Sequence, residues 1–149
     1  MNQTKDTVTA ASKADVTNTA ETVAVTAPAS KSVSHRYLMG AALAHGTSIV
    51  RHTLESRDLE RTRAILCAAG AKMEELPDST PSSGAWRVTG MDGKPSGGTA
   101  AAPLSCDVEE SGTTCRLLTA VLAAGHGVFR IHGAGRMHER PIAELTNAL

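Results

Sequence analysis

Residues 30–46 read SKSVSHRYLMGAALAHG, and residues 111–125 read SGTTCRLLTAVLAAG. Each stretch begins with hydroxyl side chains, continues with apolar residues at helical spacing and ends on a glycine, which is the pattern of a capped helix. Each is followed by a short run typical of a strand, SIVRH at 48–52 and GVFRIH at 127–132. We therefore expect one supersecondary unit to be used twice, at an offset of about 80 residues.

The residues around the first of these helices predict the rest of a mixed α/β unit. Ser56 is placed to cap a second amphipathic helix, which Gly70 ends. AKMEEL at 71–76 and AWRVTG at 85–90 are predicted strands, joined by a turn-rich segment. TVAVT at 22–26 is a predicted first strand. The order of this unit is then β-α-β-α-β-β.

A second unit begins after a Gly/Ala/Pro-rich stretch at 90–103, which we expect to be a flexible connector. LSCDV at 104–108 is a predicted strand, and the chain ends inside a helix whose first turn holds Pro141. This unit lacks the closing pair of strands. We therefore predict an α/β (α+β) fold with one complete repeat at about 23–90 and an incomplete one at about 103–149.

The N-cap of the first helix is predicted to be Ser32 or Ser34. Residues 1–22 are rich in Thr and Ala and almost free of large apolar groups, so they cannot offset the entropy of ordering and form a predicted disordered leader. A chain that ends in an uncapped helix indicates that the functional polypeptide is longer.

Composition excludes several classes of protein. Fifteen basic against fifteen acidic residues give zero formal charge, which argues against a non-specific nucleic-acid binder. No apolar run approaches about 18 residues, so no membrane span is predicted, and no signal peptide is visible. Three cysteines without a C-x-x-C motif argue against a disulfide framework and a zinc knuckle. A reduced, cytoplasmic location is the default expectation.

Both repeats place a loop of small residues and an arginine at the start of a helix, at 30–36 and at 111–116. Unpaired backbone N–H groups, the positive end of the helix dipole, hydroxyls and a cationic side chain together make an anion site. A third cationic cluster, RMHER at 136–140, precedes the last helix. If the strands of one sheet carry these loops at the same end, the three converge on a ligand with more than one anionic group.

More ordinary interpretations compete with this one. A Ser/Thr cluster before a helix is commonly only a cap, and an arginine one turn into a helix is commonly a solvated residue. Cys115 lies in the first turn of a helix, where its pKa could fall, although packing is the preferred role. The histidines form neither an H-x-x-x-H pair nor an H-E-x-x-H motif, so no metal is predicted.

The stretch PASKSVSHRYLMGAALAHG at 28–46 closely resembles the N-terminal signature of the 5-enolpyruvylshikimate-3-phosphate (EPSP) synthases, also called 3-phosphoshikimate 1-carboxyvinyltransferases. ESGTTCRLL at 110–118 and GRMHERPIAEL at 135–145 resemble that family's second and third signatures, in order and at the expected separation. The resemblance covers about residues 23–149 and corresponds to the first third or so of the family's length. It implies a fold of six β-α-β-α-β-β units in two globular domains.

The resemblance also implies an activity. The enolpyruvyl group of phosphoenolpyruvate is transferred to the 5-hydroxyl of shikimate 3-phosphate with release of phosphate, on the shikimate pathway to chorismate and the aromatic amino acids. No metal or organic cofactor is implied, and glyphosate inhibits the family by occupying the phosphoenolpyruvate position. By motif position, Lys31 would contact both substrates, and Ser32 and Arg36 would bind shikimate 3-phosphate. Phosphoenolpyruvate would also be bound by Gly112, Thr113 and Arg140. The supporting cations would be Arg116 and Arg136.

Three positions depart from the family pattern. Glu110 stands where the family often has Asn, and it would add negative charge beside the anion pocket. His35 replaces a commoner Asn, and Leu117 replaces Pro. The family's acid/base carboxylates lie in later repeats, so no catalytic residue is expected within 1–149, and this chain alone is predicted to be inactive.

Two alternatives remain at this point. One is a non-catalytic, truncated module that binds phosphorylated ligands. The other is a UDP-N-acetylglucosamine enolpyruvyl transferase, which shares the fold and the chemistry but lacks the S-K-S-x-S-x-R loop.

Overall fold

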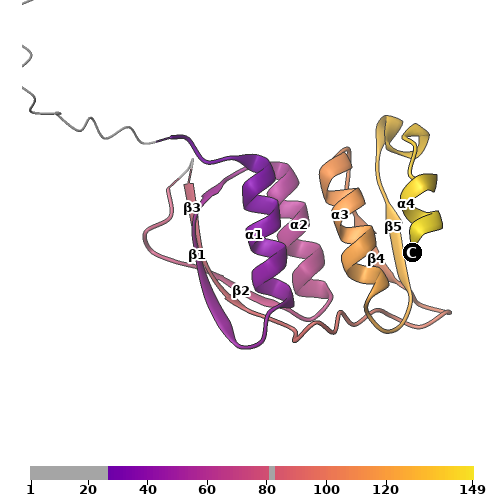
Figure 1. Ribbon diagram of the computed structural model, residues 1–149, viewed down its shortest axis with the longest axis horizontal. Coiled ribbons are helices and arrows are strands. Elements are labelled where there is room, and N and C mark those ends of the chain that lie inside the picture. The colour runs from indigo at the N-terminus through magenta and orange to yellow at the C-terminus, as the bar shows by residue number, and fades with distance from the viewer. Residues whose placement is uncertain (1–26, 81–82) are drawn as a thin grey trace, which may run out of the picture.

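A computed structural model describes residues 27–80 and 83–149 (Figure 1). The elements in chain order are α1 (Lys31–Leu43), β1 (Thr47–Leu54), α2 (Arg57–Ala68), β2 (Lys72–Glu75), β3 (Ser83–Thr89), β4 (Leu104–Asp107), α3 (Gly112–Ala123), β5 (Phe129–His132), the 3-10 helix η1 (Gly135–Glu139) and α4 (Ala143–Ala148). This order confirms the predicted mixed α/β fold. The strand predicted at 22–26 and the leader predicted at 1–22 lie outside the described residues.

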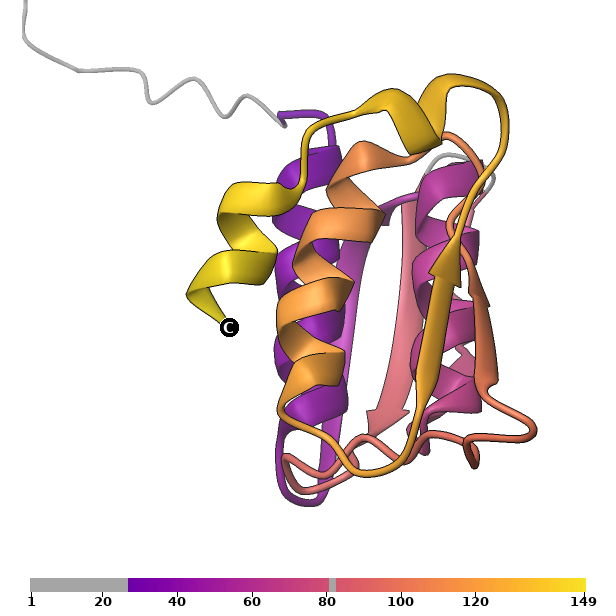
Figure 2. The same ribbon diagram turned by 90° about the vertical axis from the view of Figure 1, so that its right-hand side faces the viewer.

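The strands form two sheets. An antiparallel sheet has the order β1-β3-β2, and β4 pairs with β5 in parallel. The condition that one sheet carries all the cationic loops is therefore not met. Figures 1 and 2 show α1 and α2 side by side on the three-stranded sheet, with α3 next to them and in front of β4 and β5.

Helix starts follow from local hydroxyl chemistry. Ser56 caps α2 as predicted, because its Oγ accepts a hydrogen bond from the backbone N–H of Leu59 at 3.4 Å. The prediction for α1 is wrong, since its N-cap is Ser30. Ser34 instead donates to the Ser30 carbonyl at 2.8 Å and accepts from the backbone N–H of Leu54 at 2.9 Å. Its hydroxyl therefore fastens α1 to the end of β1.

The core is aliphatic and closely packed. Five of its side chains come from both helices and sheet and are fully buried: Leu38, Leu59, Leu66, Val88 and Leu118. Alanines at the helix contacts allow the backbones to approach, and Ala42 and Ala69 are also fully buried. Burial of these groups supplies the main stabilisation of the fold.

Two further sequence predictions are wrong. The connector at 90–103 is held by the chain on both sides, since the backbone N–H of Ser96 donates to Ala69 at 2.8 Å and that of Gly97 donates to His126 at 2.7 Å. Pro141 precedes α4 instead of lying in its first turn, and its carbonyl accepts a hydrogen bond from Arg116 at 2.8 Å. No helix in the described part of the chain is long and apolar enough to cross a membrane.

Truncation of the core tests this packing. Leu66→Ala should lower the free energy of unfolding by about 2–5 kcal/mol, because it removes buried methylenes and leaves a cavity. Urea denaturation followed by circular dichroism measures the change. Val33 is 47% exposed on α1, so Val33→Ala is the control and should change stability by less than about 0.5 kcal/mol. Equal effects of the two substitutions would contradict the assigned core.

Candidate anion-binding site

Three helices begin at one end of the molecule. Figure 1 shows α1, α2 and α3 running in the same direction, with their N-termini at the upper end. The loop between η1 and α4 reaches the same end. The predicted convergence of loops therefore occurs through parallel helices, although the strands belong to two sheets. Helix N-termini carry unpaired N–H groups and partial positive charge, so this end of the molecule attracts anions.

An open cleft of about 520 Å³ lies between these helix starts. Its lining comes entirely from the first turns of the helices and the segments before them: Lys31, Asp58, Glu110, Ser111, Gly112, Thr113, Arg116 and Arg140. The structure thus brings together five of the residues predicted from sequence. A phosphate-sized anion with a further charged group fits a polar cleft of this kind.

Lys31 and Asp58 form an ion pair across the start of α1 and α2. Lys31 Nζ lies 2.6 Å from Asp58 Oδ2, and the side chains are 45% and 31% exposed. The hydrogen bond from Lys31 lowers the pKa of Asp58 below its usual 3.8. Sequence reasoning missed Asp58, because an acidic residue in the first turn of a helix is ordinary dipole pairing. The ion pair therefore holds the ammonium group at the cleft.

The start of α3 is closely approached by Arg140. A Cβ atom added at Gly112 would lie 2.7 Å from Arg140 Nη1, so glycine leaves the guanidinium room beside the helix N-terminus. Arg116 donates to the carbonyl of Pro141 at 2.8 Å, which fastens the segment after Arg140 to α3. Two cations therefore flank the backbone N–H groups of Gly112 and Thr113.

Buried hydroxyls support the helix starts from below. Thr114 Oγ1 lies 2.7 Å from Ser111 Oγ and 3.0 Å from Thr62 Oγ1 on α2, and Thr62 also donates to the Asp58 carbonyl at 3.0 Å. Thr62 and Thr114 are fully buried, and Ser111 is nearly so. Because buried polar groups must keep their partners, this cluster fixes the first turn of α3 against the first turn of α2.

Two carboxylates compensate part of the positive charge of the cleft. Glu110 lines the cleft, as the departure from the family pattern predicts. The cleft therefore holds three cationic side chains, Lys31, Arg116 and Arg140, and two carboxylates, those of Asp58 and Glu110, which leaves an excess of one positive charge. The neighbouring Glu109 points elsewhere. It pairs with Arg57 at 2.5 Å and with Arg61, and these hydrogen bonds lower the pKa of Glu109 to about 2. This pairing fastens the β4–α3 loop to α2.

Three of the residues predicted from sequence lie outside the cleft. Arg36 donates to the backbone carbonyl of Ser32 at 2.8 Å, so its guanidinium folds back along α1. Arg136 pairs with Glu139 at 3.1 Å on the exposed 3-10 helix. Neither these arginines nor Ser32 lines the cleft. Arginine side chains are long, and sequence spacing does not determine the direction in which they fold.

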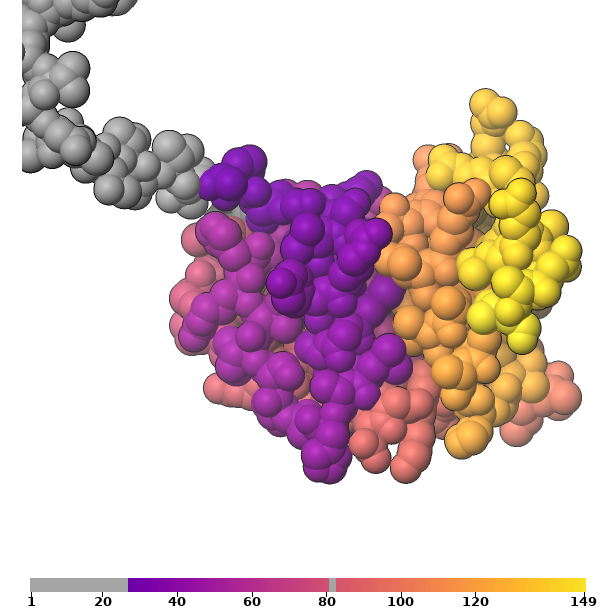
Figure 3. Space-filling view, in the orientation of Figure 1, coloured from indigo at the N-terminus to yellow at the C-terminus, as the bar shows by residue number. Residues whose placement is uncertain are grey.

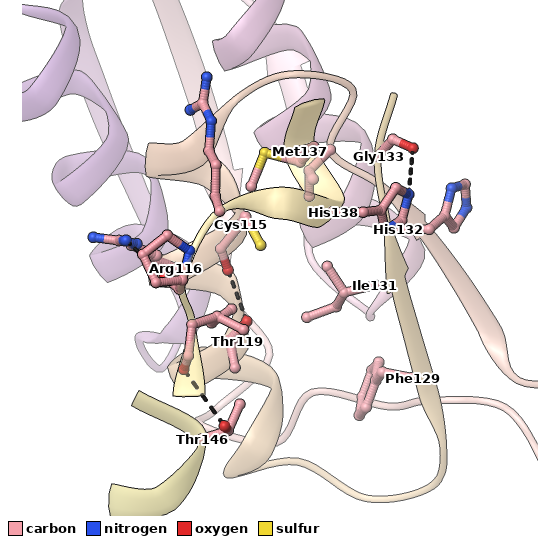
Figure 4. Close-up of a pocket in the computed structure, with 14 residues that line it drawn as sticks. Cys115, Arg116, Thr119, Phe129, Ile131, His132, Gly133, Met137, His138 and Thr146 are labelled. Carbon is pink, nitrogen blue, oxygen red and sulfur yellow. Dashed lines mark hydrogen bonds between the residues drawn. The ribbon is translucent and has the colours of Figure 1, made fainter. Parts of the chain in front are cut away.

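A second cavity, of about 330 Å³, lies beside the cleft between α3, β5 and α4 (Figure 4). Arg116 and Arg140 line both spaces, while the second is lined mostly by apolar side chains such as Phe129, Ile131 and Met137. Cys115 is buried there, and burial raises the pKa of its thiol. The preferred packing role is therefore confirmed. Within residues 27–80 and 83–149, no three potential metal ligands gather in one place.

The geometry defines a class of protein: an α/β protein in which helix N-termini and cationic side chains converge on one polar cleft. Comparison with known proteins gives the family. The chain matches the family described as EPSP synthase (3-phosphoshikimate 1-carboxyvinyltransferase) over residues 17–149. The chain belongs to this EPSP synthase family.

Named relatives agree with this assignment. Over 122 residues the chain is 40% identical to the 3-phosphoshikimate 1-carboxyvinyltransferase of Ralstonia nicotianae and 41% identical to that of Thiobacillus denitrificans. Each match covers 82% of this chain and 26% of the relative. EPSP synthase from Acinetobacter baumannii superposes with a TM-score of 0.68 at 27% identity, covering 84% of this chain and 27% of that one. The chain thus spans about a quarter of its relatives' length, less than the third expected.

Acidification tests the ion pair in the cleft. The pKa of Asp58 is lowered in the folded state, so its contribution to stability is complete above about pH 3.8 and is lost as the pH falls through the folded value. The urea midpoint of the wild-type chain should fall between about pH 5 and pH 2 more steeply than that of Asp58→Asn.

Asp78→Asn is the matched control, because Asp78 pairs with Arg51 at 2.7 Å on an exposed surface. It should follow the wild-type curve. The role assigned to Asp58 would be contradicted if the urea midpoint of Asp58→Asn fell with pH as steeply as that of the wild type, while that of Asp78→Asn fell less steeply.

Proposed function

We propose that this chain is the N-terminal portion of an enzyme that transfers the enolpyruvyl group of phosphoenolpyruvate to the 5-hydroxyl of shikimate 3-phosphate, releasing phosphate. The observation that carries the proposal is the convergence of Lys31, Arg140 and the start of α3 on one cleft. Both substrates are anions with more than one charge, and their phosphate and carboxylate groups match such a cradle. Family membership supports the reaction.

The proposed roles follow the positions of the side chains. The backbone N–H groups of Gly112 and Thr113 bind phosphoenolpyruvate, and Arg140 clamps its phosphate or carboxylate while Arg116 supports it. Lys31 is the first residue of α1 and lines the cleft, where one ammonium group can contact both substrates. For shikimate 3-phosphate, the exposed guanidinium of Arg36 leaves the Ser32 carbonyl, which frees both residues to bind the ligand.

Positioning and electrostatics are the contribution of these residues to catalysis. Two anions repel each other in water, and a site with fixed positive charge removes that cost before the reaction begins. Asp58 orients Lys31, whereas Glu110 weakens the field that draws in phosphoenolpyruvate. No group on this chain is assigned as the acid or base. In this proposal the repeats at 23–90 and 103–149 form the anion-binding part of the enzyme. The enzyme acts in the cytoplasm on small-molecule substrates and uses neither a metal nor a nucleic-acid partner.

Calorimetry tests the binding roles. Lys31→Met and Arg140→Met in the chain of residues 1–149 should each weaken phosphoenolpyruvate binding about 10- to 150-fold, since each removes a charge-assisted hydrogen bond. Arg87→Met is the control, because Arg87 on β3 pairs with Glu74 on β2 and does not line the cleft. Equal affinities of wild type and Arg140→Met would remove Arg140 from the site.

Activity requires a longer chain. The chain of residues 1–149 should release no phosphate from the two substrates, whereas residues 27–149 joined to the remaining three quarters of the Ralstonia nicotianae relative should release it. Lys31→Met in this chimera should lower the rate at least about 100-fold, because the lysine is assigned to both substrates. A folded chimera that binds both substrates without turnover would favour the non-catalytic binding module.

A further inference from the structure

His35 is a buried imidazole directly beneath the anion cleft. It lies one helical turn after Lys31 on α1 and is fully buried. Its Nδ1 atom lies 3.0 Å from Thr62 Oγ1, while Nε2 is buried with no hydrogen-bond partner in the described part of the chain. His35 is also one of the positions where the sequence departs from the Asn that the family pattern predicts. Burial of an unsatisfied nitrogen has a cost that calls for an explanation.

Hydrogen bonding and burial together favour one tautomer of this imidazole. Thr62 has one hydroxyl proton, which it donates to the Asp58 carbonyl at 3.0 Å. In this arrangement Thr62 Oγ1 accepts from His35, and the imidazole carries its proton on Nδ1. In the same arrangement Thr114 donates to Thr62 at 3.0 Å, in preference to the Asp58 carbonyl at 3.3 Å, and Ser111 donates to Thr114. With this arrangement Nε2 is a bare acceptor, and a buried bare acceptor is more common than a buried N–H without a partner. The opposite arrangement, in which Thr62 donates to Nδ1, places the imidazole proton on Nε2, which has no partner in the described part of the chain.

We propose that His35 is a positioning residue for the anion site, whose neutral imidazole holds the first turn of α3 in place through Thr62 and Thr114. The identity of the bound anion rests on the proposed function, whereas the hydrogen-bond network is independent of it. The connected groups come from all three helices that begin at the cleft. The helix turn they fix begins with Gly112 and Thr113, which line the cleft.

The hydrogen-bond network through His35 requires an uncharged imidazole. Protonation would place an N–H group on Nε2, where the described chain offers no acceptor. Burial lowers the pKa of His35 below 6.5; among the charges acting on it, Asp58 on α2 opposes this shift, and Lys31 and Arg36 on α1 reinforce it. The network is therefore complete above about pH 6.5 and is lost as the pH falls through the lower folded value. An Asn at this position would donate to Thr62 at any pH.

Amide hydrogen exchange in the chain of residues 1–149 tests the proposal. The backbone N–H of Thr114 donates to Ser111 Oγ at 3.2 Å, and that of Cys115 donates to the Ser111 carbonyl at 3.0 Å. Their protection factors in the wild type should fall about 3- to 10-fold on acidification from pH 7.5 to below the folded pKa of His35. In His35→Asn the protection of both amides should not change over the same range.

Thr62→Val separates the network from general packing, since it removes the hydroxyl at nearly constant volume. It should lower the protection of Thr114 and Cys115 about 3- to 10-fold at pH 7.5 and weaken phosphoenolpyruvate binding by a similar factor. Thr119→Val is the matched control, because the Thr119 hydroxyl donates to the Cys115 carbonyl inside α3 and is not part of the Thr62–Thr114 network. Long-range ¹H–¹⁵N correlation spectra should show the proton on Nδ1 of His35.

A proton on Nε2, or unchanged protection of Thr114 and Cys115 in Thr62→Val, would overturn the proposal. If the wild-type chain binds neither phosphoenolpyruvate nor inorganic phosphate, the proposed function fails. The protection factors still decide the role of His35 in that case, because they need no ligand.

Discussion

The contact between Thr62 on α2 and Thr114 on α3 is the constraint on which the site depends. It joins α2 to the first turn of α3, and both hydroxyls are fully buried. Parallel helices that begin together place like partial charges side by side, which is unfavourable without a compensating anion. Asp58 supplies part of that compensation within the chain. The remaining positive potential is available to a ligand.

The balance of charge in the cleft favours selectivity over raw affinity. An excess of one positive charge attracts an anion less strongly than three uncompensated cations, but it also penalises ligands that lack a group for each cation. Glu110 and Asp58 therefore do more than weaken binding. They favour ligands that carry several anionic groups in the right positions, which is a property of the two proposed substrates. Figure 3 shows α1 and α3 meeting along one face of the molecule, so segments far apart in the sequence contribute to this surface.

The ends of α2 were predictable from the sequence, whereas the N-cap of α1, the direction of long side chains and the contacts between helices were not. Ser56 and Gly70 mark the ends of α2 because a hydroxyl cap and a glycine at φ 123° are decided within a few residues. The pairing of Lys31 with Asp58 spans 27 residues and depends on how two helices pack. Arg36 has the predicted position on α1 but folds back to Ser32, because a backbone carbonyl lies within its reach. The network below the cleft joins residues that no motif connects.

The most direct test of the account is a map of ligand-induced shifts in the backbone amides of the chain of residues 1–149. Titration with phosphoenolpyruvate in ¹H–¹⁵N correlation spectra reports which N–H groups meet the anion. The account predicts that the largest shifts fall on Gly112 and Thr113, with smaller ones at the starts of α1 and α2. Shifts confined to the sheet faces or to the C-terminal ends of the helices would contradict it.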